Sequence, residues 1–353
     1  MIIRLAIFAA LLSIAAAAAA WADPAEDALN EALKLHDAGN LKEAIAQYDR
    51  AIQINRRFAN AYLNRGHAYA DLGDEQRAIK DYTEALRLSP KEADAYFNRG
   101  NAYRRLGQHD RALRDYTAAI RLAPEDEDTY LNRGTTYYSL GQYESALRDY
   151  NEAIRLNPKE ADAHYNRGNT YARMGKKEQA VEDYNQALRL NPQLVEAYYN
   201  RGIAHADLGR HEQAVLDFTE VIKSHPEYAE AHYNRAMARE KLGQNEQAIK
   251  DYTQAIRLDP KDPEALYNRA LAYSRLAQYD YAARDLTELV MLMPRNAEAY
   301  GRRGVIRLYQ GRNEEAEADF KKAYQLDAQL KKKLQPLIDE AKKKAKVEPA
   351  LVK

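Results

Sequence analysis

Three residue types recur at fixed spacing in this sequence, and each could do chemistry with a ligand or with its neighbours. Asparagine, arginine and glycine stand together at intervals of 34 residues, as in Asn98-Arg99-Gly100. An aspartate follows each arginine sixteen residues later, as Asp115 follows Arg99. An amide offers one hydrogen-bond acceptor and two donors, and a guanidinium matches a carboxylate with two parallel bonds. The pattern therefore predicts amide recognition of a polar chain and repeated arginine–carboxylate pairs.

Catalytic chemistry has no comparable signal. The chain contains no cysteine, which excludes disulfides, thiolate metal sites and a thiol nucleophile. It also lacks an HExxH motif, a phosphate-binding glycine loop, a GxSxG motif and a cluster of zinc ligands. We therefore expect no enzymatic activity, no cofactor and no metal site.

The charge balance argues against a nucleic-acid partner. Lysine plus arginine equals aspartate plus glutamate, with 53 residues of each sign. A neutral chain has no general electrostatic attraction to phosphates, and the repeated arginines are matched by repeated aspartates. We expect no nucleic acid among the partners.

The elements that must position these residues come from one unit that is repeated along the chain. Nine units of 34 residues begin at residues 25, 59, 93, 127, 161, 195, 229, 263 and 297. A glycine at place 15 of the unit, such as Gly73, is typical of a helix end, and a proline near place 32, such as Pro90, closes a second helix. Small residues at places 8 and 20 would let the two helices approach closely. Each unit is thus predicted to be an antiparallel helix pair.

The repeat resembles the tetratricopeptide repeat family closely. The period, the glycine at place 8, the alanine at place 20, the aromatic residue at place 24 and the terminal proline all match that family. The resemblance covers residues 25–330. It implies an all-α fold, a right-handed α-α superhelix in which the first helix of each repeat lines the concave side. We expect this solenoid over residues 23–330, followed by a capping helix and lysine-rich tail over 331–353.

Arginine at place 7 and aspartate at place 23 occur in the same eight repeats. The first repeat has neither residue and carries Glu31 and Gln47 instead. Because places 7 and 23 lie at similar heights in a helical hairpin, we expect a bidentate and partly buried structural ion pair inside each repeat. The central pairs are Arg99 with Asp115, Arg133 with Asp149, and Arg167 with Asp183.

Asparagine at place 6 has two open interpretations. In the family that the chain resembles, this place faces the concave groove, where a ladder of amides could hold an extended peptide by its backbone. Alternatively, the amides bond locally to a neighbouring repeat. The residues are Asn64, Asn98, Asn132, Asn166, Asn200, Asn234 and Asn268.

Two further places shape the expected groove. Place 5 is bulky, and Phe97, Tyr165 and Tyr199 could either line the groove or pack between helices. Place 2 is mostly acidic, as at Asp94 and Glu264. Chaperone adaptors of this family grip a C-terminal carboxylate with lysines at places 2 and 5, so capture of such a tail is not expected here.

These features predict a scaffold or adaptor that binds proteins through extended segments in the groove, in cell-envelope assembly or secretion. Two other functions remain open. The solenoid could associate with itself as a structural spacer, or it could act as the regulatory subunit of a partner enzyme.

The N-terminal segment predicts export. Met1 to Arg4 is basic, residues 5–20 form an apolar run broken only by Ser13, and Ala20-Trp21-Ala22 suits signal peptidase. We expect a cleaved signal peptide over residues 1–22 and a periplasmic location. The alternative is an uncleaved helix that anchors the protein to a membrane, for which this run is short against the roughly 20 residues of a typical span. No other membrane contact is expected.

Overall fold

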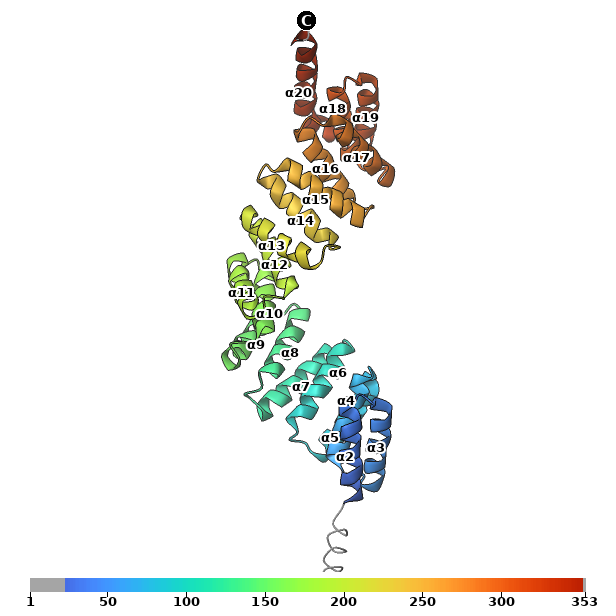
Figure 1. Cartoon of the computed structure of the whole chain (residues 1–353), viewed down its shortest axis with the longest axis vertical. Coiled ribbons are helices and arrows are strands. Elements are labelled where there is room, and N and C mark those ends of the chain that lie inside the picture. The colour runs from blue at the N-terminus through green and yellow to red at the C-terminus, as the bar shows by residue number, and fades with distance from the viewer. Residues whose placement is uncertain (1–22, 352–353) are drawn as a thin grey trace, which may run out of the picture. The chain divides into compact units, whose positions relative to one another are not determined.

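The computed structural model describes residues 23–351, and this part of the chain is helical without any strand (Figure 1). The predicted signal peptide therefore lies outside the described residues. The helices fall into two compact units, one ending at Thr170 and the other beginning at Tyr171. Each unit is a stack of antiparallel helix pairs, so the prediction of an all-α solenoid is confirmed.

The helices alternate as first and second members of successive repeats. In the N-terminal unit they are α2 (Pro24–Asp37), α3 (Leu41–Ile54), α4 (Ala59–Asp71), α5 (Glu75–Leu88), α6 (Ala93–Arg105), α7 (His109–Leu122), α8 (Glu127–Ser139) and α9 (Tyr143–Leu156). Helix α10 (Ala161–Arg173) spans the boundary between the units. In the C-terminal unit they are α11 (Lys177–Leu190), α12 (Val195–Asp207), α13 (His211–Ser224), α14 (Ala229–Lys241), α15 (Asn245–Leu258), α16 (Pro263–Arg275), α17 (Tyr279–Leu292), α18 (Ala297–Tyr309), α19 (Asn313–Leu326) and α20 (Leu330–Leu351).

The place-15 glycines end the first helices in the left-handed conformation. Gly73 has φ +77°, its N–H donates to the Ala70 carbonyl at 2.9 Å, and the next N–H donates to the Tyr69 carbonyl at 2.8 Å. These two bonds satisfy carbonyl groups that the end of α4 would otherwise leave without a partner. Glycine is favoured here because a side chain clashes with the backbone at positive φ.

Ala277 is the exception in this series, and it gives a stability prediction. It stands at place 15 of the eighth repeat with φ 56°, the one positive φ of a non-glycine residue in the described chain. Ala277→Gly should raise the free energy of unfolding by about 0.5–1 kcal/mol. Relief of left-handed strain, about 1–2 kcal/mol, exceeds the entropy that glycine adds to the unfolded chain. Urea unfolding followed by circular dichroism measures the change, and Gly243→Ala should have the opposite sign. A lower midpoint for Ala277→Gly would contradict the prediction.

The place-8 glycines allow close packing inside each hairpin, although not against the residue type that the sequence suggested. A Cβ atom built on Gly100 would lie 2.8 Å from the ring of Tyr116, which occupies place 24. The place-24 ring, and not the place-20 alanine, is therefore the group nearest to the missing side chain of Gly100. Alanine stands at place 8 in three repeats, where place 24 is Tyr48, Tyr252 or Leu286.

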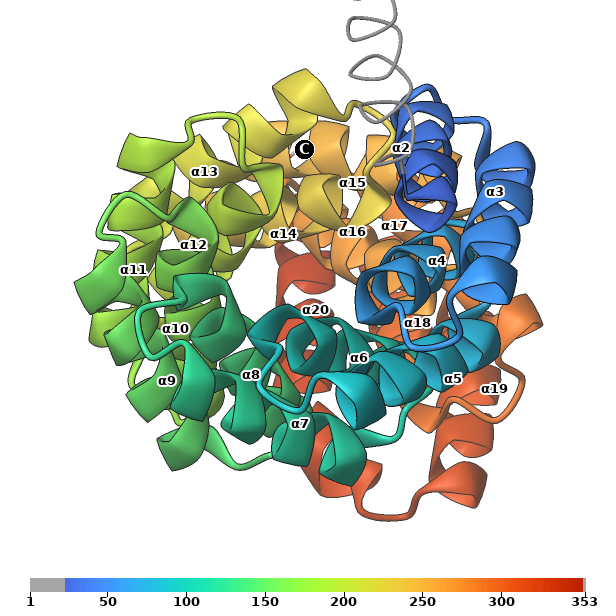
Figure 2. The same cartoon turned by 90° about the horizontal axis from the view of Figure 1, so that it is seen from below.

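Successive hairpins stack so that the first helices lie on the inside of each curve. Figure 2 shows the hairpin of α2 and α3 beside α4 and α5, and α3 contacts α4 directly. In the N-terminal unit α2 also contacts α4, α4 contacts α6, and α6 contacts α8, whereas consecutive second helices contact each other less. A stack whose first helices are closer together bends toward them, which turns places 2, 5 and 6 to the inner side.

Helix α20 covers the end of the last repeat. Leu330, Leu334, Ile338 and Ala341 are buried in one cluster with residues of α18 and α19. Pro336 lies inside α20 on its exposed side and does not end the helix. Over residues 23–351, no helix has the length and apolar character needed to cross a membrane.

Candidate functional site

The inner surface combines a structural layer of arginines with a layer of amide, phenol and carboxylate groups. In the structural layer, Arg133 donates from Nε and Nη2 to the two oxygens of Asp149, at 2.8 and 2.7 Å. Asp149 is 5% exposed, so its charge is compensated almost entirely by this arginine. Arg99 binds Asp115 in the same way at 2.7 and 2.9 Å. Arg167 and Asp183 belong to different units, and their pairing stays a prediction.

Each arginine also has a second partner, bound through a third hydrogen bond, that the sequence analysis missed. Nη1 of Arg133 donates to the Thr117 hydroxyl of the preceding repeat at 3.2 Å. The same bond joins every place-7 arginine to place 25 of the repeat before it, at Asp49, Thr83, Thr117, Asn151, Asn185, Thr219, Thr253 and Thr287. The arginine thus connects three helices of two repeats, and we call this unit the arginine staple.

The sequence does carry a signal for this second partner. Place 25 holds a hydrogen-bond acceptor in the first eight repeats, but it is Lys321 in the ninth, where no further arginine follows. Place 25 therefore lacks an acceptor only in the last repeat, after which no arginine staple follows. Likewise, place 7 lacks an arginine only in the first repeat, where it is Glu31.

Burial and charge act against each other in the staple. Burial lowers the pKa of Arg65, but the hydrogen bonds and charges of Asp81 and Asp49 outweigh it and raise the pKa above its ordinary value. Burial raises the pKa of Asp81, and Arg65 opposes this shift. Tyrosine rings also surround the arginine of the staple. The Arg99 guanidinium lies 5.7 Å from the centre of the Tyr96 ring and 5.9 Å from that of the Tyr103 ring.

The second layer is formed by places 2, 5 and 6 of the first helices, and we call it the first-helix strip. Its members include Asn60, Leu63, Asn64, Asp94, Phe97, Asn98, Asp128, Leu131 and Asn132 in the N-terminal unit, and Glu196, Tyr199, Asn200, Glu230, Tyr233, Asn234, Glu264, Tyr267, Asn268 and Glu298 in the C-terminal unit. The place-2 side chains are all exposed and form its acidic edge. Tyr165 and Asn166 are half-buried on α10, and Asn200 is half-buried on α12.

The asparagines of the N-terminal unit bond to their own helices. Nδ2 of Asn64 donates to the Asn60 carbonyl at 2.8 Å, and Asn98 donates to the Asp94 carbonyl at the same distance. Asn132 donates to the Asp128 carbonyl at 2.9 Å. This bond uses one of the three hydrogen-bonding positions of each amide, and the Oδ1 of Asn132 also accepts from the Arg104 guanidinium of the preceding repeat at 3.4 Å.

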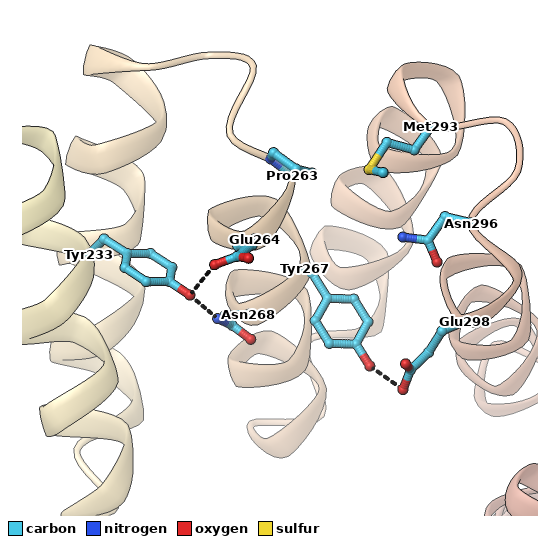
Figure 3. A pocket seen from close by; sticks show the side chains of 8 residues that line it. All are labelled: Tyr233, Pro263, Glu264, Tyr267, Asn268, Met293, Asn296 and Glu298. Carbon is cyan, nitrogen blue, oxygen red and sulfur yellow. Dashed lines mark hydrogen bonds between the residues drawn. The ribbon is translucent and has the colours of Figure 1, made fainter. Parts of the chain in front are cut away.

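In the C-terminal unit Asn234 and Asn268 bond to a tyrosine of the preceding repeat. Asn268 donates to the Tyr233 hydroxyl at 2.9 Å, and this hydroxyl donates to Glu264 at 3.2 Å (Figure 3). Asn234 makes the same bond to the Tyr199 hydroxyl at 3.0 Å, and the Tyr267 hydroxyl donates to Glu298 at 2.8 Å. Local bonding to a neighbouring repeat therefore occurs for Asn234 and Asn268, as one of the two interpretations expected.

Place-5 rings have a packing role as well as a place on the strip. The Phe97 ring lies 6.2 Å from the Tyr116 ring, and the Tyr199 ring lies 5.9 Å from the Phe218 ring, centre to centre. Burial raises the pKa of Tyr199 to about 12, and the nearby Tyr228 and Glu230 act in the same direction. The Tyr199 hydroxyl therefore stays protonated at neutral pH and can donate a hydrogen bond.

A cavity of about 400 Å³ opens on the strip between α14, α16 and α18 (Figure 3). Its lining consists of Tyr233, Pro263, Glu264, Tyr267, Asn268, Met293, Asn296 and Glu298. It contains two carboxylates and two phenol rings but no lysine or arginine. Among the described residues, no group of three or more histidine, aspartate or glutamate side chains is arranged to hold a metal ion.

Comparison with protein families identifies the repeats. A profile described as "TPR repeat" matches residues 32–73, 66–107, 134–175 and 238–276. Three profiles described as "Tetratricopeptide repeat" match residues 93–126, 161–194 and 195–228, residues 218–250, and residues 297–330. No match was found among curated proteins.

Solved structures share the fold of parts of the chain. A tetratricopeptide repeat protein from Parabacteroides merdae is 22% identical and covers 70% of this chain and 98% of its own, with a TM-score of 0.50. The pilF protein of Pseudomonas aeruginosa is 20% identical and covers 62% of this chain and 96% of its own, with a TM-score of 0.52. YrrB, described as a TPR protein with an unusual peptide-binding site, is 26% identical over 52% of this chain and 95% of its own, with a TM-score of 0.46.

Proposed function

The chain belongs to the tetratricopeptide repeat family, whose members generally mediate protein–protein interactions, and we propose on this basis that it binds extended segments of partner proteins along the first-helix strip. The family and its fold are typically non-catalytic, and we propose no catalytic role. The observation that carries the proposal is the regular spacing of amides on the strip. Asn64 and Asn98 each keep an acceptor and a donor beyond the bond to their own helix, and Asn132, whose oxygen accepts from Arg104, keeps a donor. Such positions can pair with the N–H and C=O groups of an extended backbone.

The acidic edge of the strip adds a preference to this backbone recognition. Asp94 and Asp128 are exposed at place 2 in the N-terminal unit, and Glu230 and Glu264 are exposed at the same place in the C-terminal unit. Exposed carboxylates attract positively charged segments over about 10 Å at 0.1 M salt, and higher salt weakens the attraction. Segments with basic residues should therefore bind better than acidic ones, and the difference should shrink as salt is raised.

A display library of unstructured peptides tests the proposal with purified protein. Asn64→Ala, Asn98→Ala and Asn132→Ala combined should weaken binding of the selected peptides at least about tenfold, because three hydrogen bonds of roughly 0.5–1.5 kcal/mol are lost. Alanine is the better helix former, so circular dichroism should show an unchanged helix content. The matched control changes Gln213 and Gln247, exposed amides on the second helices, to alanine. Equal affinities of the unchanged protein, the asparagine variant and the glutamine control would show that the asparagines of the strip do not bind the peptide.

We also propose that the protein works outside the cytoplasm, as a scaffold in cell-envelope assembly or secretion. This part rests on the sequence of residues 1–22 alone, with its basic start, apolar run and Ala20-Trp21-Ala22. Mass spectrometry of the protein from its native cells should give an N-terminus at Asp23. A mature chain that begins at Met1 would favour the membrane-anchored alternative.

A further inference from the structure

The repeats of this chain can be compared with one another, and the comparison points to the use of the cavity near Tyr267. Place 34 is the last residue of each repeat. In the sixth repeat, place 34 is Tyr228, whose ring stacks on Tyr199 with the centres 5.0 Å apart and an angle of 25° between the planes. This part of the strip therefore accepts a flat group stacked on the place-5 tyrosine.

In the eighth repeat the same place holds a shorter side chain. Place 34 is Asn296 and the place-5 ring is Tyr267, and both line the 400 Å³ cavity. Figure 3 shows Asn296, Met293 and Glu298 facing the Tyr267 ring across this space. The cavity thus lies where a ring equivalent to Tyr228 would stack, and it has Tyr267 as its aromatic wall.

The charges around the cavity specify the flat group further. Glu264 is exposed, accepts a hydrogen bond from the Tyr233 hydroxyl, and has no lysine or arginine within ion-pair distance among the described residues. Glu298 accepts from the Tyr267 hydroxyl and lies 3.6 Å from Arg302. Two carboxylates at one cavity, one of them without a cationic partner, favour a cation over a neutral ring.

We propose that this cavity binds an arginine side chain of a partner segment, with the guanidinium stacked on Tyr267 and donating to Glu264 and Glu298. An arginine meets both requirements, because its guanidinium is planar, carries a permanent charge and has several donors in one plane. A lysine would meet only the charge requirement, and a tyrosine only the stacking one. The chain already uses this contact internally, since the Arg77 guanidinium lies 4.5 Å from the centre of the Tyr69 ring. The proposal rests on the proposed function, because it places one residue of the extended segment.

The methionines make the site observable. The chain contains five methionines, of which Met293 lines the cavity and Met237 lies in a different cavity beside Ile203 and Lys241. The experiment titrates ¹³C-methyl-methionine-labelled protein with the peptide Ac-Gly-Arg-Gly-NH₂ and follows the methyl signals by NMR, assigned with Met293→Leu. The Met293 signal should shift to saturation while the Met237 signal stays in place. The citrulline and tyrosine versions of the peptide should bind at least about tenfold more weakly, since each lacks the charge.

Two variants at one position separate filling of the cavity from loss of a helix cap. The Asn296 side chain caps α18 by accepting from the Ala299 N–H at 3.0 Å, so both variants lose this bond. Asn296→Tyr should abolish the Met293 shift because the new ring stacks where the guanidinium would lie, whereas Asn296→Ala should keep it. Glu264→Gln should lower the affinity for the arginine peptide and leave the lower affinity for the citrulline peptide unchanged.

Other outcomes would overturn the proposal. A Met293 signal that does not move, or moves equally with the citrulline or tyrosine peptide, excludes an arginine site. If Asn296→Ala and Asn296→Tyr reduce the Met293 shift equally, the reduction comes from the lost helix cap and not from filling of the cavity. Since the display experiment depends on asparagines of the N-terminal unit, it can succeed while this titration fails. The strip would then bind peptides without an arginine site.

Discussion

Arg133→Ala is expected to lower the free energy of unfolding by about 3–5 kcal/mol. The substitution leaves the Asp149 carboxylate 5% exposed without its cation. It also removes the bond to Thr117 in the preceding repeat. Urea unfolding monitored by circular dichroism gives the magnitude, and hydrogen exchange should show that amides of α8 and α9 open first.

A double-mutant cycle separates the pair from its surroundings. Asp149→Ala should also destabilise, and the double variant should be several kcal/mol more stable than the sum of the two losses predicts, because the uncompensated charge is gone. The matched control is the exposed pair of Arg155 and Glu152, at 2.6 Å, where Arg155→Ala should change the stability by less than about 1 kcal/mol. Additive losses at Arg133 and Asp149 would mean that the pair contributes no coupling.

Leu334→Ala is expected to cause a loss of about 2–5 kcal/mol at the C-terminal end. Leu334 is 2% exposed in α20 and packs on Gly301 of α18, where no side chain intervenes. Since each repeat is stabilised mainly by its neighbours, the loss should open α18 to α20 and leave α2 to α5 unchanged. Native-state hydrogen exchange measures both regions in one sample.

The exposed residue Lys333 supplies the control for this variant. Lys333→Ala lies one residue away on the outer side of α20 and should change the stability by less than about 0.5 kcal/mol. Faster exchange of equal size at both ends of the chain would contradict the local character of the effect.

The sequence was sufficient for the hairpins, because each repeat carries its own boundaries. Gly73 and Pro90 mark helix ends through backbone chemistry that needs no knowledge of the neighbours. The place-7 arginine and the place-23 aspartate could likewise be paired, since both belong to one hairpin.

Contacts between repeats were harder to predict, because they depend on how one hairpin stacks on the next. The bond from Arg133 to Thr117 crosses such a boundary, and so does the bond from Asn268 to the Tyr233 hydroxyl. Asn296 lines the cavity beside Tyr267, and the contact between places 34 and 5 that Tyr228 makes with Tyr199 is visible only in the structure. The sequence indicates that place 25 contacts the following repeat only through Lys321, which replaces the acceptor in the last repeat.

The arginine staple also bears on how such a chain can change its length over generations. Every internal repeat offers an acceptor at place 25 to the repeat after it and an arginine to the repeat before it, as Thr117 and Arg133 illustrate. If a whole 34-residue repeat is duplicated or deleted, the two repeats that become neighbours would therefore still form a complete arginine staple. The two ends are different, because Glu31 and Lys321 match no such junction. Copy number is thus free to vary in the middle of the array, while the first and last repeats are fixed in their positions.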